Sequence, residues 1–282
     1  MERQGYRPST IKSTIASLTP LSPYLHDPEQ AKQFLAEMKI CESRKVKIVY
    51  DLARYYKMKG IPFDKPRYRQ IPRIPYVPLE KDLDALIAGL SKKPMTFCQI
   101  LKETGARAGE VMALRWLDVD LERQTVSIQA EKNSKPRLLK LSNRLVGMLN
   151  LLPRDGKFVF HSDTIEGSVA LSSIRRNFER QKKYLAEKTL NSNIQRITLH
   201  TFRHWRATQL YAQTKDILYV KEQLGHRSIN STLVYVQLQD CKSEDYHVKT
   251  AKNQSEATPL IEEGYQYVCT TPDQIMIFRK RK

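Results

Sequence analysis

Two segments near the N-terminus carry apolar residues at helical spacing. DPEQAKQFLAEMK begins with Asp27, a residue type that caps helices, and places Pro28 at the first helical position, where its missing N–H is not needed. SRKVKIVYDLARYYKMKG repeats apolar side chains at helical intervals and ends at Gly60, a common helix stop. This pattern predicts short helices in the N-terminal part of the chain.

A proline-rich segment follows these helices. Five prolines lie between Ile61 and Pro78, and proline fixes the backbone and removes a hydrogen-bond donor. No regular element is expected there, and interspersed lysine and arginine make the segment basic. The pattern predicts a helical N-terminal domain, a proline-rich basic linker, a second domain and a C-terminal extension, covering residues 1–60, 61–78, 79–240 and 241–282.

The second domain mixes helical and strand periodicity. Its first predicted helices lie in LEKDLDALIAGL and on both sides of Gly105 in PMTFCQILKETGARAGEVMALRW. QTVSIQA and PRLLKL then alternate apolar and polar residues, and the polar EKNSK joins them, so a β-hairpin is predicted. Helical spacing resumes in NRLVGMLNLL, SSIRRNFERQKKYLAEKT and residues 200–238.

The C-terminal extension is expected to form one helix and two short strands, within SEATPLIEEGYQYVCTT and QIMIFRKRK. Taken with the preceding segments, this predicts a mainly α-helical chain with a small β-sheet, folded as two domains.

The net charge adds information about partners. The 282 residues include 48 Lys+Arg and 30 Asp+Glu, which gives a net charge of +18. Self-repulsion of this size destabilises a compact fold, so a strongly basic protein usually has an acidic partner. Nucleic acid is the first interpretation, and an anionic membrane surface or added solubility are the alternatives.

The sequence lacks the signals of membrane insertion and secretion. No run of about 18 apolar residues occurs, and MERQGYRPST has no apolar signal segment, so a cytoplasmic location is expected. The cysteines form no CxxC pair and are expected to be reduced thiols rather than a disulfide framework or a zinc site. They are Cys41, Cys98, Cys241 and Cys269.

Histidines and arginines gather in RITLHTFRHWRATQLY. On a helix, His200 shares a face with Arg203 and His204. The HxxxH spacing occurs in zinc sites, but the hydrolase version needs Glu after the first histidine, where this chain has Thr201. A solvated basic face and a phosphate-binding site are the other interpretations. The phosphate site requires another arginine, a nucleophile and a proton donor.

Groups of these types occur elsewhere in the chain, and each has an ordinary structural interpretation by itself. Arg107 follows a glycine turn in ETGARAGEVMALRW, where an arginine either caps the turn or points into a cleft. Lys132 and Lys135 lie at the predicted hairpin tip, where lysines are usually solvated. Tyr235 lies in an apolar helical stripe, where tyrosine usually packs.

In their order along the chain, these groups resemble the tyrosine recombinase (phage integrase) family. The matching pieces are TGARAGEV with Arg107, the hairpin Lys132, HTFRH with His200 and Arg203, LGH with His226, and Tyr235. The separations of HxxR, LGH and the tyrosine are the most specific part. The resemblance implies an N-terminal helical core-binding (SAM-like) domain at 1–60 and a mixed α/β catalytic domain at 79–240.

The resemblance also implies a reaction, in which DNA is cut and rejoined through a covalent 3′-phosphotyrosine without metal, ATP or another cofactor. Tyrosine has a pKa of about 10 and is a weak nucleophile at neutral pH without help. Attack on phosphorus builds negative charge, which fixed guanidinium groups stabilise. Tyr235 is therefore the expected nucleophile, and Arg107 and Arg203 are expected to hold the phosphate in place of a metal.

The same resemblance assigns the proton transfers. Lys132 is expected to protonate the leaving 5′-oxygen, with Lys135 as the alternative if the hairpin alignment is shifted by three residues. His200 is expected to assist proton removal from Tyr235 or to hold the phosphate, and His226 to hydrogen-bond the phosphate. Both roles suit a side chain that titrates near neutral pH.

Neighbouring side chains offer competing interpretations. Asp118 and Asp120 suggest a two-metal nuclease, although the resembled family commonly has acidic residues at this turn. Glu110 is expected to orient helices or the arginine, and His204 is expected to support the site rather than act chemically. The rival nucleophiles, none of which has the family's spacing, are Tyr211, Tyr219 and Tyr246.

The expected partner is double-stranded DNA carrying a specific recombination site, with four protomers assembled on it and no membrane involved. Basic residues of the N-terminal helices, the linker, the hairpin and SSIRRNFERQKK are expected to contact DNA, mainly through phosphates. They are Arg44, Lys45, Lys47, Arg67, Arg69, Arg73, Lys135, Arg175, Arg176 and Arg180. A cytoplasmic, nucleoid-associated location follows from such a partner.

The C-terminal extension is longer than a minimal C-terminus of this family, and LIEEGYQYVCTTPDQIMIFRKRK is similar to tails of some archaeal integrases. It is expected to dock on the next protomer, or alternatively to be a basic tail that contacts DNA or nothing. Its length favours integration or excision of a mobile element over Xer-like chromosome-dimer resolution. A type IB topoisomerase-like enzyme and an inactive DNA-binding relative remain as alternatives.

Overall fold

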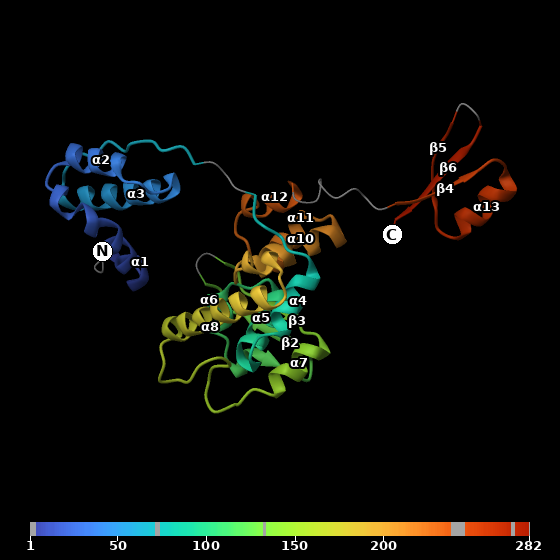
Figure 1. The fold of residues 1–282 in the computed structure, drawn as a ribbon, viewed down its shortest axis with the longest axis horizontal. Helices are drawn as coiled ribbons and strands as arrows, with labels where there is room; N and C mark the ends of the chain where they lie inside the picture. The colour runs from blue at the N-terminus through green and yellow to red at the C-terminus, as the bar shows by residue number, and fades with distance from the viewer. Residues whose placement is uncertain (1–3, 71–73, 132–133, 238–245, 272–273, 282) are drawn as a thin grey trace. The chain divides into compact units, whose positions relative to one another are not determined.

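The computed structural model describes residues 4–70, 74–131, 134–237, 246–271 and 274–281 (Figure 1). The chain divides into two compact units, Met1–Arg73 and Ile74–Lys282. The division falls inside the segment whose prolines predict a linker.

The first unit is helical. Asp27 accepts a hydrogen bond of 2.8 Å from the backbone N–H of Glu29, which satisfies one of the free donors at that helix start. Gly60 ends the last helix with φ of 69°, a left-handed conformation that glycine adopts without strain. Both predicted helices are therefore confirmed. The elements are α1 (Pro8–Leu18), η2 (Thr19–Tyr24), α2 (Pro28–Glu37) and α3 (Glu42–Lys59).

The first part of the proline-rich segment packs on the first unit. The Phe63 ring stacks on that of Tyr56, a buried residue of α3, with centroids 5.0 Å apart. The Lys45 ammonium lies 5.4 Å from the centroid of the Tyr68 ring. Ile61, Phe63 and Tyr68 thus extend the apolar core of the unit, which the prolines alone do not predict.

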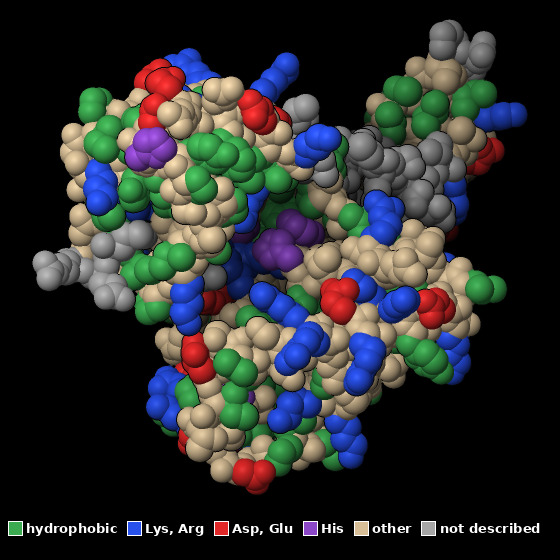
Figure 2. Space-filling model, turned by 60° about the vertical axis from the view of Figure 1, so that its left-hand side comes forward, with side chains coloured by type: hydrophobic (Ala, Val, Ile, Leu, Met, Phe, Trp, Pro, Cys, Tyr) green, Lys and Arg blue, Asp and Glu red, His purple; other side chains and the backbone are tan. Residues whose placement is uncertain are grey.

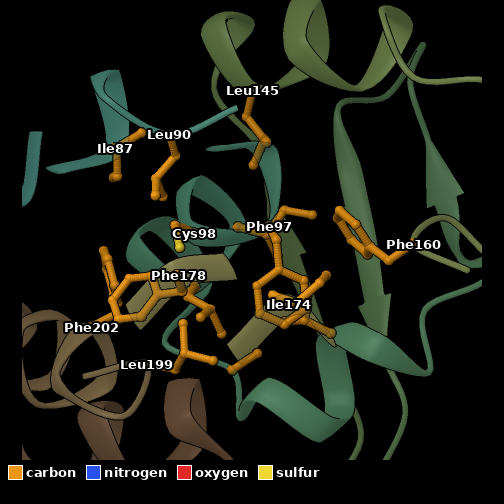
Figure 3. Packing of buried hydrophobic residues seen from close by; sticks show 14 of the residues in the cluster. Ile87, Leu90, Phe97, Cys98, Leu145, Phe160, Ile174, Phe178, Leu199 and Phe202 are labelled. Atoms are coloured by element: carbon orange, nitrogen blue, oxygen red, sulfur yellow. The ribbon is translucent and has the colours of Figure 1, made fainter. Parts of the chain in front are cut away.

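The second unit surrounds a large apolar core with helices (Figure 1). Its helices up to the tail are α4 (Glu80–Ala88), α5 (Lys92–Thr104), α6 (Ala108–Met112), η3 (Trp116–Asp118), α7 (Asn143–Asn150), α8 (Gly167–Lys188), α9 (Ser192–Gln195), α10 (Thr201–Thr214), α11 (Ile217–Leu224) and α12 (Asn230–Gln237). Within the core, the Phe97 ring meets that of Phe160 edge to face, with centroids 5.1 Å apart (Figure 3).

A small antiparallel sheet covers part of this core. Its strands are β1 (Val119–Asp120), β2 (Thr125–Ile128) and β3 (Arg137–Lys140), in that spatial order. Val126 pairs with Leu139, and both side chains are buried, whereas Leu138 is exposed. The alternation in QTVSIQA and PRLLKL therefore predicted the hairpin correctly.

The C-terminal extension forms an α/β segment with an apolar core of its own. Its elements are β4 (Tyr246–Ala251), α13 (Gln254–Glu262), β5 (Gln266–Thr270) and β6 (Met276–Arg281), with strand order β4-β6-β5. Ala251 and Phe278 are buried in that core together with Ala257 and Leu260 of α13. The prediction of two strands was incomplete, because β4 has no apolar run and is held by backbone pairing with β6.

Candidate active site

Arg107 stands between two helices, and its conformation is fixed by Glu110. Gly105 ends α5 in a left-handed conformation with φ of 61°, and α6 begins directly after Arg107. The Glu110 carboxylate accepts the Arg107 backbone N–H at 2.9 Å and its guanidinium Nη1 at 3.2 Å. The Arg107 side chain remains 27% exposed, so its guanidinium is accessible to a ligand.

Arg203 lies at the centre of the site and is almost completely buried, with 1% exposure. Its guanidinium donates to the carbonyl oxygens of Gly105 at 2.7 Å and Leu224 at 2.9 Å. Burial, followed by the charges of Arg107 and Arg137, lowers the Arg203 pKa to about 10, which leaves it charged at neutral pH. Arg203 therefore links the C-terminal ends of α5 and α11 through hydrogen bonds, and its positive charge is shielded from solvent.

Tyr235 and His204 are directly hydrogen-bonded. The Tyr235 Oη lies 3.0 Å from His204 Nδ1, and the tyrosine is 2% exposed. Burial raises the pKa of the Tyr235 phenol, although Arg203 and Arg107 oppose the shift. Burial, then His200 and Arg203, lowers the His204 pKa to about 4. At neutral pH the pair therefore consists of a phenol and an uncharged imidazole.

The other two histidines of the resemblance are also neutral. The rings of His200 and His204 meet edge to face, with centroids 4.7 Å apart, and burial, Arg203 and Arg107 lower the His200 pKa. His226 Nδ1 lies 2.9 Å from Oγ1 of the buried Thr232. Burial, followed mainly by Arg203 and Arg107, lowers the His226 pKa to about 3. Figure 2 shows histidine side chains gathered with Lys and Arg side chains nearby.

The hairpin tip lies against the LGH turn. Lys132, the expected proton donor, lies outside the described residues. The Lys135 backbone N–H donates to the Gly225 carbonyl at 3.1 Å, and the Ser134 hydroxyl donates to the same oxygen at 3.2 Å. Ser134 also forms a β-bridge with His226. Ser134 and Lys135 are thus attached next to His226, and the Lys135 side chain is exposed.

Arg137 belongs to the site and was not found from the sequence. Its Nη2 donates to Glu110 Oε2 at 2.8 Å, and the exposures of the two side chains are 6% and 0%. Burial opposes ionisation of Glu110, but the hydrogen bond and charge of Arg137 outweigh it and lower the pKa of the carboxyl. A signal was available, because Arg137 precedes Leu139 by two positions and so takes an inward-facing strand position.

The competing residues have structural partners. Asp118 forms an ion pair of 3.0 Å with Arg115, and Asp120 accepts the backbone N–H of Arg123 at 2.8 Å. Among the described residues, no group of three or more His, Cys, Asp and Glu side chains is arranged to hold a metal ion. Of the rival tyrosines, Tyr211 packs on the apolar cluster around Tyr235, Tyr219 is 40% exposed, and the side chain of Tyr246 is outside the description.

The candidate DNA contacts differ in availability. Lys45 is buried and donates to the carbonyl of Ala36 at 2.9 Å, which corrects the expectation that its ammonium is free for DNA. Lys47 is half-buried and pairs with Asp51 at 2.7 Å. Arg73 lies outside the described residues. The exposed members of the set are Arg44, Arg67, Arg69, Lys135, Arg175, Arg176 and Arg180.

Helices within the described part of the chain are all too short or too polar to cross a bilayer.

Comparison with known proteins gives one family for this region. The sequence model of the phage integrase family matches residues 79–242. A probable integrase/recombinase protein of Methanocaldococcus jannaschii is 30% identical over 143 residues, which cover 49% of this chain and 43% of that protein. A tyrosine recombinase of Agathobacter rectalis is 32% identical over 157 residues, which cover 52% of this chain and 48% of that protein. The chain spans about half the length of these relatives.

Solved structures share the fold at low sequence identity. The Tn1549 transposon integrase in complex with a circular intermediate DNA matches with a TM-score of 0.61 and 14% identity, covering 93% of this chain and 96% of that chain. A lambda integrase dimer bound to a COC′ core site matches with a TM-score of 0.61 and 12% identity, covering 87% of this chain and 76% of that chain. The predicted fold class, mainly α with a small β-sheet, is confirmed.

Proposed function

The chain belongs to the phage integrase family, and from this membership we propose that it is a site-specific DNA recombinase with Tyr235 as its nucleophile. One observation carries the proposal. The buried Tyr235 hydroxyl is held at 3.0 Å by His204, on the helix that also carries the buried, charged Arg203. A phenol poised beside a base and fixed guanidinium charge is what attack on a phosphodiester requires.

In the proposed reaction, Tyr235 Oη attacks the phosphorus of one DNA strand. The new bond from Oη to phosphorus forms as the bond to the 5′-oxygen breaks, which leaves a 3′-phosphotyrosine and a free 5′-hydroxyl. A 5′-hydroxyl of the recombining strand then attacks the phosphotyrosine, so the number of phosphoester bonds is conserved and no ATP is consumed. The same atoms serve cleavage and rejoining.

Guanidinium groups stabilise the charge that builds on phosphorus. Guanidinium groups are strongly basic, and the planar N–H groups of Arg203 and Arg107 match phosphate oxygens. Arg203 is positioned by two carbonyl oxygens and Arg107 by Glu110, so little reorganisation is needed when the phosphate binds. These charges take the part that a metal plays in other phosphoryl-transfer enzymes, and the proposal includes neither metal nor cofactor.

The leaving 5′-oxygen takes a proton from the hairpin, from Lys132 or alternatively Lys135. Attachment of Ser134 and Lys135 to Gly225 supports this role, because it holds the described end of the hairpin loop next to His226. His226 is proposed to donate a hydrogen bond to a phosphate oxygen through Nε2, since Nδ1 already contacts Thr232.

We propose double-stranded DNA with a specific recombination site as the substrate and a tetramer as the working assembly. Residues 1–60 act as the core-binding domain, residues 79–240 as the catalytic domain, and the extension 241–282 docks on a neighbouring protomer. Integration or excision of a mobile element is favoured over chromosome-dimer resolution by the extension and by the likeness to an archaeal integrase/recombinase. A cytoplasmic, nucleoid-associated location follows from this substrate.

Covalent trapping tests the proposal. Duplex DNAs made from the sequence flanking the gene, with a pool carrying randomised arms, are nicked so that cleavage releases a short 5′-hydroxyl fragment. With chelator present, wild-type protein is expected to form a denaturation-resistant DNA adduct that Tyr235→Phe does not form. Tyr219→Phe is the matched control, because this tyrosine is 40% exposed.

Three results would contradict the proposal. An adduct that survives Tyr235→Phe would move the nucleophile elsewhere, and loss of the adduct only with chelator would indicate metal-dependent chemistry. Relaxation of plasmids without sequence preference would indicate a topoisomerase-like enzyme instead of a site-specific recombinase.

A further inference from the structure

The hydrogen bond between His204 and Tyr235 raises the question of which histidine takes the proton of the nucleophile. We propose that His204 is a catalytic residue, the general base that accepts the Tyr235 proton, and that His200 acts on the phosphate instead. This inference rests on the proposed function of Tyr235 and deepens it. It changes the expected role of His204, which was support of the site.

Geometry favours His204 over His200. The distance of 3.0 Å between His204 Nδ1 and Tyr235 Oη is within the range for direct proton transfer. Within the described residues, His200 meets His204 edge to face and makes no hydrogen bond to Tyr235. His200 immediately precedes α10, so one helical turn separates the two imidazoles along the same face.

The surroundings leave His204 in the uncharged form, which is the form that can accept a proton. Tyr235 is 2% exposed and packs with Ala207 and Leu210 of α10 and Val220 and Leu224 of α11, so bulk water is largely excluded from the tyrosine. Burial and nearby positive charges keep His204 neutral at physiological pH. With the proton of the neutral ring on Nε2, Nδ1 is a hydrogen-bond acceptor aimed at the phenol.

The proton balance of the step closes within the site. As the bond from Tyr235 Oη to phosphorus forms, the phenolic proton moves to His204 Nδ1 and the imidazole becomes a cation. That cation lies near the negative charge of the five-coordinate phosphorus, which stabilises it. In rejoining, the 5′-hydroxyl oxygen bonds to phosphorus as the bond from Oη to phosphorus breaks. The hydroxyl proton passes to the hairpin lysine, and His204 returns the phenolic proton to the tyrosinate.

The test measures the rate of adduct formation by the His204→Ala and His204→Gln variants. The substrate is the nicked duplex on which wild-type protein forms the adduct. Loss of a general base is expected to slow cleavage by about 100- to 10,000-fold. His161→Ala, at a histidine whose ring stacks on that of Phe158, is the matched control and is expected to cleave at the wild-type rate. Thermal melting and binding of the same duplex check that each variant is folded.

Chemical rescue separates a base from a structural support. Replacing Tyr235 by 3,5-difluorotyrosine gives a more acidic phenol that needs less help to ionise, so it is expected to restore much of the rate lost in His204→Ala. A duplex with sulfur in place of the bridging 5′-oxygen supplies a leaving group that needs no proton. It is expected to rescue Lys132→Ala but not His204→Ala.

The outcomes distinguish the two levels of the proposal. Wild-type-like cleavage by folded His204→Ala, or rescue by the sulfur-containing duplex but not by difluorotyrosine, would overturn the role of His204 while Tyr235 remained the nucleophile. The same defect and the same rescue in His200→Ala alone would assign the base to His200. Failure of wild-type protein to form any adduct would overturn the proposed function and this inference with it.

Discussion

The Arg137 guanidinium donates a 2.8 Å hydrogen bond to the Glu110 carboxylate. The same carboxylate holds Arg107, the arginine at the start of α6. In the proposed reaction, a buried anion placed beside Arg107 would compete with the DNA phosphate for that guanidinium. Because Arg137 neutralises part of the Glu110 charge, we propose that Arg107 is positioned by Glu110 and still able to bind phosphate.

The first prediction tests this balance by removing the Arg137 charge. Arg137→Met is expected to slow adduct formation by roughly 10- to 100-fold, the effect of displacing a reacting group by about 1 Å. It is also expected to lower the free energy of unfolding by about 3 kcal/mol, because it leaves a buried carboxylate with one partner fewer. Adduct kinetics and urea unfolding measure the two effects.

A second substitution tests whether Arg137 acts through the charge of Glu110. Adding Glu110→Gln to Arg137→Met removes the competing anion, so the double variant is expected to cleave faster and unfold at higher urea than Arg137→Met alone. Lys140→Met, at an exposed position of β3, is the matched control. Additive losses in the double variant would show that the two residues do not act on Arg107 together.

This part of the molecule also marks the limit of prediction from the sequence. The hairpin itself was predictable, since alternation in QTVSIQA and PRLLKL is a local pattern. The partner of Arg137 is 27 residues away, and the partner of His204 is 31 residues away, so both contacts depend on how α6, β3, α10 and α12 pack. The inward strand position of Arg137 indicated a buried charge, but it did not identify Glu110 as the partner.

Gly225 provides the second prediction. It has φ of 68°, and an added Cβ would lie 2.8 Å from the Lys135 carbonyl oxygen, 2.9 Å from Arg137 Nη1 and 2.9 Å from Ser134 Oγ. Gly225→Ala is therefore expected to displace the hairpin tip and slow cleavage. It is also expected to lower the free energy of unfolding by more than the roughly 1 kcal/mol that backbone strain alone would cause. Urea unfolding and adduct kinetics are the measurements.

Gly60 is a control with the same backbone conformation. Its φ is 69°, but nothing lies within 4 Å of an added Cβ. Gly60→Ala is expected to lower the free energy of unfolding by the backbone strain alone and to leave the cleavage rate unchanged. Equal losses of stability in the two variants, with cleavage unaffected in both, would mean that the hairpin contact at Gly225 is dispensable.

The third prediction concerns stability at mildly acidic pH. His226 and His204 have pKa values of about 3 and about 4 in the folded protein, against 6.5 for an unperturbed histidine. Below pH 6.5 the unfolded chain therefore binds protons that the folded protein does not, and stability falls as the pH decreases. Above pH 6.5 neither state binds these protons, so the contribution vanishes.

The expected loss is roughly 1.4 kcal/mol per pH unit for each histidine between the two pKa values. Burial is the main reason that His226 stays neutral, and the charged and titratable groups that add to it are Arg203, Arg107, Arg137 and His200. Urea unfolding at pH 7, 6 and 5 measures how steeply the free energy of unfolding changes with pH. His226→Gln is expected to make this dependence less steep. An identical slope in wild-type and variant protein would contradict the assignment.

The last prediction concerns DNA affinity, which phosphate contacts make dependent on salt. Arg175 and Arg176 are exposed on α8, whereas the Lys45 ammonium donates to the Ala36 carbonyl at 2.9 Å. Replacing either arginine by Gln is expected to weaken binding to a random-sequence duplex and reduce the log–log salt slope by about one. Lys45→Gln is expected to lower the unfolding temperature and leave the slope unchanged, because its charge is engaged within the N-terminal unit. Fluorescence anisotropy at several salt concentrations distinguishes the two classes, and a reduced slope for Lys45→Gln would return that lysine to the DNA surface.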